Sequence, residues 1–368
     1  MKLKSLIMFS AAALAFAACS NDNEAVDGSI KGNGVVEVKL VAPSTRAAVP
    51  GTGGAAGEDK VVVKGDITVV LTYAGTQTKE AVITQAEREG KSEYNVKFWD
   101  ITNPVKVEAF VNDATKKYGD VSKVAVTEFA NIMPENIPAY GVDNTITPKG
   151  ETEVNGGKTY EMYEARVEMN IPVARLEVSG ITHVTHTGEP DDVCKYATLT
   201  IDGIYLDKIK TTGGAQTVTD YHYPAVGTSG EAGYIPAPIL WEAITSESFL
   251  QEGKVWPAAV EDVNYAYAFN FYPNGSLQMP LVKIYFAEAT GNGEEVSQPR
   301  YAVIKSYNGE TDFEFEAGKI YRITKVELAD NNIIGDEEGN TLWGVDVTVV
   351  EAAWDVVDLS AEWVEDAQ

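Results

Sequence analysis

The chain has 368 residues, which is beyond the size at which one hydrophobic core keeps growing, so two domains are expected. Its 55 acidic and 29 basic residues give a net charge of −26 at pH 7, and a surface so acidic repels nucleic acid and anionic lipid. Composition therefore excludes nucleic acid as an expected partner. The only cysteines are Cys19 and Cys194, and neither of them indicates a disulfide-stapled fold.

The N-terminus has the pattern of a signal peptide over residues 1–18. Lys2 and Lys4 precede an apolar run that is too short to span a membrane and that ends in small residues before Cys19. This arrangement resembles a bacterial lipobox, although Phe16 stands where leucine is usual. The sequence predicts that Cys19 is acylated and becomes the new N-terminus. The alternative is a plain secretory peptide with an incidental cysteine.

The first strand is predicted at residues 35–41, where Val36, Val38 and Leu40 share one face. Pro43 ends this pattern, and small residues follow through Gly57.

Arg46 and Ala47 lie in that small-residue stretch, which has no apolar face to bury. A basic side chain in such a stretch suits cleavage by a trypsin-like protease. The alternative is an ordinary linker after an N-terminal strand.

The body of the chain is dominated by short alternating segments, which favour β-sandwiches. The pair Asn155-Gly156 with Gly157 predicts a hairpin within residues 151–170, and Ile171-Pro172 is a plausible domain boundary. Short helices are expected at 120–132 and at 239–250. Strands are expected over segments that include 60–73, 94–98, 105–111, 174–178, 197–201, 265–271, 282–286, 313–315 and 320–328.

The C-terminal tail, residues 341–368, is unusually rich in tryptophan and valine for a chain end, and such side chains are costly to leave in water. One interpretation is that part of the tail fills a groove on another molecule. The alternative is that it forms the last strands of the second domain. The candidate groove-filling residues are Val345, Val347, Val349, Trp354, Val356 and Leu359.

No catalytic residue, metal site or cofactor is predicted. His183 and His186 would point to opposite faces of a strand, which is a poor arrangement for one metal ion. The sequence has no phosphate-binding loop, nucleophile elbow or Cys-x-x-Cys pair, and Cys194 is expected to be an inert thiol. An enzyme is therefore not expected.

Taken together, these features resemble the FimA-type fimbrillins, the major stalk subunits of type V pili. The resemblance rests on the lipobox at Cys19, the first strand with its Arg46-Ala47 pair, and the apolar tail. It also rests on three short motifs, which are IPAYG at 137–141, VARLEV at 173–178 and GKIYRITKVEL at 318–328.

The resemblance implies an all-β protein with two transthyretin-like β-sandwich domains in tandem and few short helices. It implies a lipoprotein precursor anchored in the outer membrane, cleavage after Arg46 by a trypsin-like protease, and polymerisation by strand exchange into surface fimbriae that mediate adhesion. The expected partners are other copies of the chain and accessory fimbrial subunits. The implied segments are a signal peptide at 1–18, a propeptide at 19–46 and domains at 47–172 and 173–368.

A second hypothesis is a monomeric surface lipoprotein that binds glycans through a β-sandwich. Trp241 and Trp256 would then stack on sugars, whereas packing within the core is the simpler role for both rings.

Overall fold

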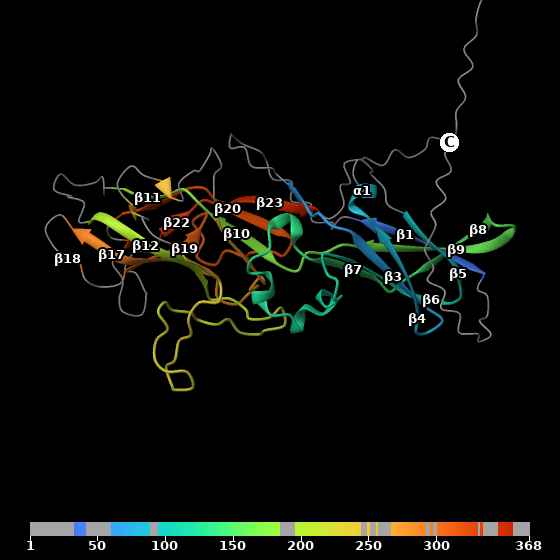
Figure 1. Ribbon diagram of the computed structural model, residues 1–368, viewed down its shortest axis with the longest axis horizontal. Coiled ribbons are helices and arrows are strands. Elements are labelled where there is room, and N and C mark those ends of the chain that lie inside the picture. Colours follow the sequence, from blue (N-terminus) through green and yellow to red (C-terminus); the bar gives the residue numbers. More distant parts are fainter. Residues whose placement is uncertain are drawn as a thin grey trace, which may run out of the picture.

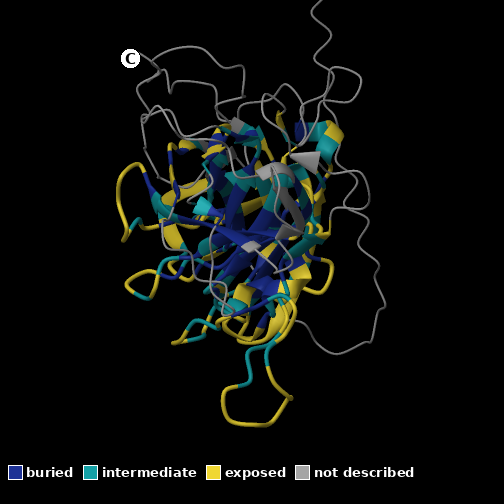
Figure 2. Ribbon diagram, turned by 90° about the vertical axis from the view of Figure 1, so that its left-hand side faces the viewer, coloured by how far each residue is buried: buried dark blue, intermediate teal, exposed yellow. Residues whose placement is uncertain are grey.

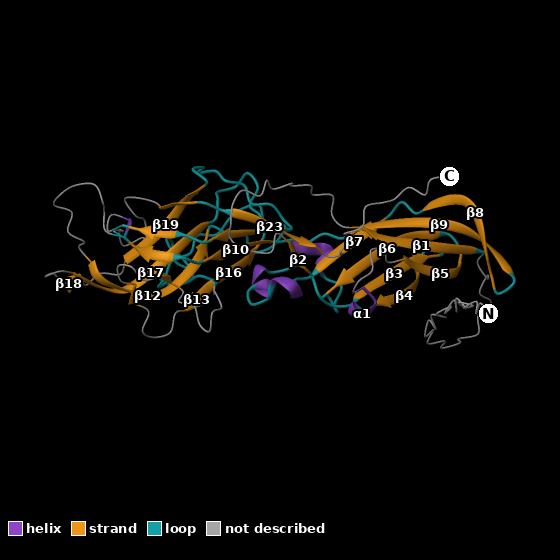
Figure 3. Ribbon diagram, turned by 90° about the horizontal axis from the view of Figure 1, so that it is seen from above, coloured by secondary structure: helices purple, strands orange, loops and turns teal. Residues whose placement is uncertain are grey.

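The computed structural model of the protein describes residues 33–41, 60–88, 95–184, 196–243, 249–250, 255–256, 266–291, 295–296, 300–329, 332–333 and 345–355. Within these ranges the strands form five sheets, which are grouped into two sandwiches that follow one another along the long axis of the molecule (Figures 1 and 3). Cys19 and the Arg46-Ala47 pair lie outside the described residues.

The first sandwich consists of two four-stranded sheets. One has the order β5-β1-β9-β8 and the other has the order β4-β3-β6-β7. Alternating apolar residues from both sheets meet in one core, in which Val36, Val69 and Val107 are fully buried. The strands of the first sheet are β1 (Gly34–Val41), β5 (Asn95–Ile101), β8 (Thr147–Asn155) and β9 (Lys158–Glu168). Those of the second are β3 (Ile67–Tyr73), β4 (Gln77–Ile83), β6 (Pro104–Val111) and β7 (Ala139–Asp143).

The second sandwich contains a five-stranded sheet of order β16-β10-β20-β23-β2. Its strands are β2 (Lys60–Val62), β10 (Ala174–Val178), β16 (Tyr267–Phe271), β20 (Lys319–Ile323) and β23 (Val350–Asp355). By sequence β2 belongs with the first sandwich, yet it pairs in parallel with β23 near the chain's end.

A larger sheet lies across from it, with the order β13-β12-β17-β19-β22 and two short strands, β14 and β18, at its side. A small sheet has the order β15-β11-β21. Buried residues of both sandwiches belong to one hydrophobic core, and Figure 2 shows buried residues in dark blue at the centre of the molecule. The larger sheet contains β12 (Tyr196–Asp207), β13 (Trp241–Ala243), β14 (Phe249–Leu250), β17 (Leu281–Gly291), β18 (Glu295–Val296), β19 (Arg300–Tyr307) and β22 (Val345–Val347). The small one contains β11 (Ile181–His183), β15 (Val255–Trp256) and β21 (Val326–Leu328).

Short helices gather mainly where the two sandwiches meet (Figure 3). They are α1 (Gln85–Arg88), η1 (Tyr118–Lys123), η2 (Val126–Phe129) and η3 (Pro134–Asn136). None of the helices among the described residues is long and apolar enough to cross a bilayer.

A buried polar contact joins the helical segment to the second sandwich. The Asn270 amide, 1 % exposed, donates to the carbonyl oxygens of Phe129 at 2.8 Å and Ile132 at 3.0 Å. The Arg175 guanidinium donates in turn to Asn270 Oδ1 at 3.1 Å. The Tyr272 hydroxyl donates to the carbonyl of Val124 at 3.1 Å. Because buried polar groups cost free energy when unpaired, these bonds fix one arrangement of the two sandwiches.

Several local predictions can be compared directly with the backbone. The hairpin is confirmed, because Asn155 pairs with Lys158 and both glycines between them have positive φ. The helix expected over 239–250 is wrong, since β13 and β14 both pair there with β12. The helix expected over 120–132 is replaced by the 3₁₀ turns η1 and η2, which suits a segment rich in β-branched residues. In IPAYG, a side chain at Gly141 would bring its Cβ to 2.2 Å from the Glu168 carbonyl, so only glycine fits.

Candidate functional site

The candidate site is β1 together with the groove in which it lies, defined by its neighbours β5 and β9. The strand is a central one, since it pairs antiparallel with β5 and parallel with β9. The parallel register is continuous for eight residues, from Gly34 opposite Glu161 to Val41 opposite Glu168. Removing β1 would therefore leave two unpaired strand edges in the middle of a sheet.

The side chains of β1 fill the core of the first sandwich. Val36 and Val38 are fully buried and Leu40 is 5 % exposed, so the three residues predicted to share a face do so. Val35, on the opposite face, is also fully buried. Four such side chains gain about 6–12 kcal/mol from burial, at roughly 1.5–3 kcal/mol each.

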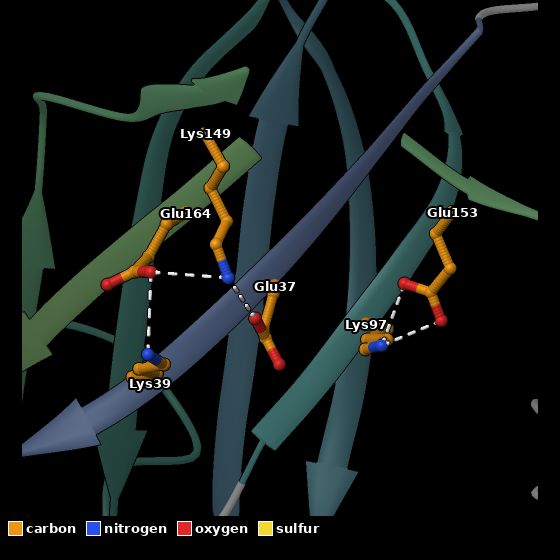
Figure 4. Close-up of polar contacts among 6 residues, drawn as sticks. All are labelled: Glu37, Lys39, Lys97, Lys149, Glu153 and Glu164. Atoms are coloured by element: carbon orange, nitrogen blue, oxygen red, sulfur yellow. Dashed lines mark hydrogen bonds and ion pairs between the residues drawn. The ribbon is translucent and has the colours of Figure 1, made fainter. Parts of the chain in front are cut away.

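The outer face of β1 carries a chain of ion pairs, drawn in Figure 4. Lys149 of β8 lies 3.3 Å from Glu37 of β1 and 3.7 Å from Glu164 of β9. Lys39 of β1 lies 3.4 Å from the same Glu164 oxygen. The strand thus contributes an acid and a base, at alternate outward positions, to a network whose other members lie on β8 and β9.

Lys149 contacts both carboxylates of this network, those of Glu37 and Glu164. Partial burial alone would lower its pKa, but the Glu37 hydrogen bond and the charges of Glu37, Glu164 and Glu151 outweigh it and raise the pKa above 10.5. A raised folded-state pKa means that the favourable interaction is fully present below the usual lysine pKa and is lost only as pH rises through the raised value. The Lys149–Glu37 contact is therefore insensitive to pH near neutrality.

β1 continues along the chain into residues 42–59, which lead to β2 in the second sandwich. Arg46 and Ala47 lie in this segment, outside the described residues, so the cleavage pair stays a prediction.

The tail residues predicted to fill a groove are placed as follows. Val345, Val347 and Val349 are 3–8 % exposed, and β22 pairs in parallel with β19 of the same chain. The backbone of Trp354 lies in β23 opposite Val61. Val356 and Leu359 lie outside the described residues. The placement of residues 345–355 matches the alternative in which the tail supplies the last strands of the second domain, and a donor role stays a prediction.

The tryptophans considered for sugar stacking are engaged within the chain. The Trp241 ring stacks on Tyr223 with centroids 4.1 Å apart and lies so close over Gly203 that a Cβ there would come within 2.1 Å of the indole. The Trp256 Nε1–H donates to the Tyr267 hydroxyl, and burial raises the pKa of Tyr267 to about 12. These contacts agree with the simpler role of both rings in packing.

His183 is 1 % exposed on β11, and His186 lies outside the described residues. Among the described residues no cluster of three or more histidine, cysteine, aspartate or glutamate side chains could hold a metal ion.

Sequence reasoning missed the ion pairs around β1. Lys149 and Glu164 are more than 100 residues from Glu37 along the chain, and only the fold brings the three together. The one available signal was the polar alternation of Glu37 and Lys39 between buried positions.

No protein-family model matches the sequence, and no curated protein matches it. Solved structures do match. A candidate cell adhesion protein from Bacteroides eggerthii is 15% identical, with 90% of this chain and 100% of that chain covered and a TM-score of 0.51.

Two further neighbours are more distant. A fimbrilin from Porphyromonas gingivalis is 12% identical, with 90% of this chain and 100% of that chain covered and a TM-score of 0.48. A candidate cell adhesion protein from Parabacteroides distasonis is 14% identical, with 89% of this chain and 98% of that chain covered and a TM-score of 0.45. The fimbrilin expected from the sequence is thus among the neighbours. The chain has the fold of the Bacteroides eggerthii protein and is an all-β protein with two β-sandwiches in tandem and few short helices.

Proposed function

We propose that this chain is the stalk subunit of a cell-surface fimbrium, polymerised by donor-strand exchange after cleavage at Arg46 and contributing to adhesion. The observation that carries the proposal is the position of β1, a central, buried strand joined to the body only through the segment that contains Arg46. The likeness in fold to a candidate cell adhesion protein, and the presence of a fimbrilin among the neighbours, fit this proposal. The partners are other copies of the chain, accessory fimbrial subunits and a trypsin-like protease.

The covalent link decides whether β1 can be replaced. While it is intact, β1 competes for its groove at an effective concentration on the order of millimolar, which no strand from another subunit can match. After cleavage β1 is a separate peptide. Its burial gains about 6–12 kcal/mol, whereas ordering eight residues costs on the order of 8–16 kcal/mol, so these two terms nearly cancel. The backbone hydrogen bonds to β5 and β9 then decide how firmly an untethered β1 is held. A strand that another subunit keeps in place can then occupy the groove.

The direct test is to treat the purified precursor with trypsin and follow it by SDS gel electrophoresis and electron microscopy. We expect a ladder of SDS-resistant oligomers and filaments whose subunits begin at Ala47. Polymer subunits that begin at Cys19 or Ser20 would contradict the proposal, because β1 would still be attached.

Before cleavage, we propose that the precursor is an outer-membrane lipoprotein acylated at Cys19. Cys19→Ala should abolish palmitate incorporation, because no other cysteine follows a signal peptide. Metabolic labelling with palmitate measures this, and Cys194→Ala is the matched control that should keep its label. Undiminished label on Cys19→Ala would exclude acylation at this residue.

A further inference from the structure

We propose that Lys149 sets the register of the strand in the β1 groove, and that Asp358 from a second copy of the chain takes the place of Glu37 there. The inference rests on the proposed function, since it specifies how the incoming strand is recognised. The occupant is residues 356–361 of the neighbouring subunit, in the direction of β1.

On the outer face at this level the cation that contacts Glu37 is Lys149 Nζ, at 3.3 Å from the carboxylate. Lys97 of β5 is opposite Glu37 in the β1–β5 register, but its Nζ lies 2.8 Å from Glu153. Lys149 belongs to β8, so it remains when β1 leaves, and its side chain is only 25 % exposed. Without Glu37 it retains Glu164 at 3.7 Å, but Glu164 also loses Lys39. An incoming strand therefore restores the network by presenting an acid at the position of Glu37 and no acid at the position of Lys39.

The tail repeats the pattern of β1. Residues 35–40 read VVEVKL and residues 356–361 read VVDLSA, which places an apolar pair, an acid, an apolar, a polar and an apolar residue in the same order. In this alignment Asp358 lies at the position of Glu37, and Ser360 lies at that of Lys39. The buried positions of Val36, Val38 and Leu40 receive Val357, Leu359 and Ala361.

Other registers are less suitable. Moving the tail by one residue would turn Asp358 into the core, because strand side chains alternate between faces. Moving it on by two would place Glu362 at the position of Lys39, beside Glu164. In the reversed direction Asp358 can face Lys149 only if Asp355 enters the buried position of Leu40.

One reversed register remains, in which Glu362 faces Lys149. It would place Trp363 at the position of Val36, which is fully buried, and such an increase in volume overpacks a core. The forward register keeps valine there and is therefore preferred.

A second segment of the tail has a similar pattern, VVEAAW at 349–354. This one is occupied in its own subunit, because Val349 is 8 % exposed and Glu351 lies 3.0 Å from Lys319 of β20. The segment at 356–361 is the remaining candidate for the groove of another copy.

Charge exchange between subunits tests the pairing. After trypsin cleavage, Lys149→Glu and Asp358→Lys subunits should each form SDS-resistant oligomers at least about tenfold more slowly than the unchanged protein, because like charges then face each other. The double variant Lys149→Glu/Asp358→Lys should recover the rate. An equal mixture of the two single variants should also recover it, because each then offers the strand that the other accepts.

A peptide assay removes any dependence on the folding of the variants. A peptide of residues 354–366 is added to the unchanged, cleaved protein, and its incorporation is measured by mass spectrometry. Asp358→Lys in the peptide should reduce incorporation at least about tenfold, whereas Ser360→Lys, which restores the charge of Lys39, should not.

The outcomes distinguish a failure of the proposed function from a failure of the register assignment alone. If the unchanged protein does not polymerise after cleavage, the proposed function fails. If it polymerises and Asp358→Lys assembles at the normal rate, the register assignment alone is overturned. Loss of assembly in Glu362→Lys, with Asp358→Lys unaffected, would assign the reversed register instead.

Discussion

Replacing Arg46 by alanine should give a folded monomer that does not polymerise. The change removes the charge that a trypsin-like protease recognises, in a small-residue stretch with no apolar face to pack. The free energy of unfolding should change by no more than about 0.5 kcal/mol, as is usual for loop sites without packing. Because β1 stays covalently attached, it keeps its groove filled and every incoming strand is excluded.

Size-exclusion chromatography after trypsin treatment measures the effect, and Arg46→Lys is the matched control. Trypsin accepts lysine as well as arginine, so Arg46→Lys should polymerise in trypsin but not with an arginine-specific protease. An Arg46→Ala protein that forms filaments at the normal rate would show that release of β1 is not required.

Ending the chain after Asp355 should leave a folded subunit that accepts a strand but cannot offer one. β23 ends at this residue, so the five-stranded sheet and the Lys319–Glu351 contact are preserved. Alone, the shortened protein should give no ladder after cleavage. When it is mixed with the unchanged protein, the shortened subunit should occupy the ends of filaments. Filament length should therefore fall as the fraction of shortened subunit rises.

A chain that ends after Val349 is the informative comparison. It lacks β23, which lies between β20 and β2, and it should lose stability because β20 becomes an edge strand and β2 loses its partner in this sheet. Thermal unfolding measured by circular dichroism distinguishes the two truncations. Full-length filaments from the protein ending after Asp355 would exclude residues 356–368 as the donor.

The alternation of apolar residues was sufficient to predict the strand class of the fold and the burial of Val36, Val38 and Leu40. These properties depend on the alternation of apolar and polar residues within one short segment, which can be read from the sequence of that segment alone. The helix expected over 239–250 failed because pairing with β12 overrides local preference.

Two features of the site depend on contacts that are distant in sequence. Lys149 faces Glu37 only because β8, β9 and β1 are neighbours in one sheet. Likewise β2 meets β23 although their paired residues, such as Lys60 and Ala353, are far apart in the sequence. Strand order determines both contacts, and strand order is not encoded in the period of any one segment.

The Asn270 contact has a mechanical consequence for a filament. If each subunit holds one neighbour in the groove of its first sandwich and the other through the tail that follows β23 of its second sandwich, a pull on the fibre passes through the junction between the sandwiches. There the two hydrogen bonds of Asn270 and the one of Tyr272 join the helical segment to the second sandwich. The rings of Phe129 and Tyr272 also meet edge to face across this junction, with their centroids 5.4 Å apart. Bonds that share a load must break together, so each subunit would behave as a stiff link and the fibre would bend where one subunit meets the next.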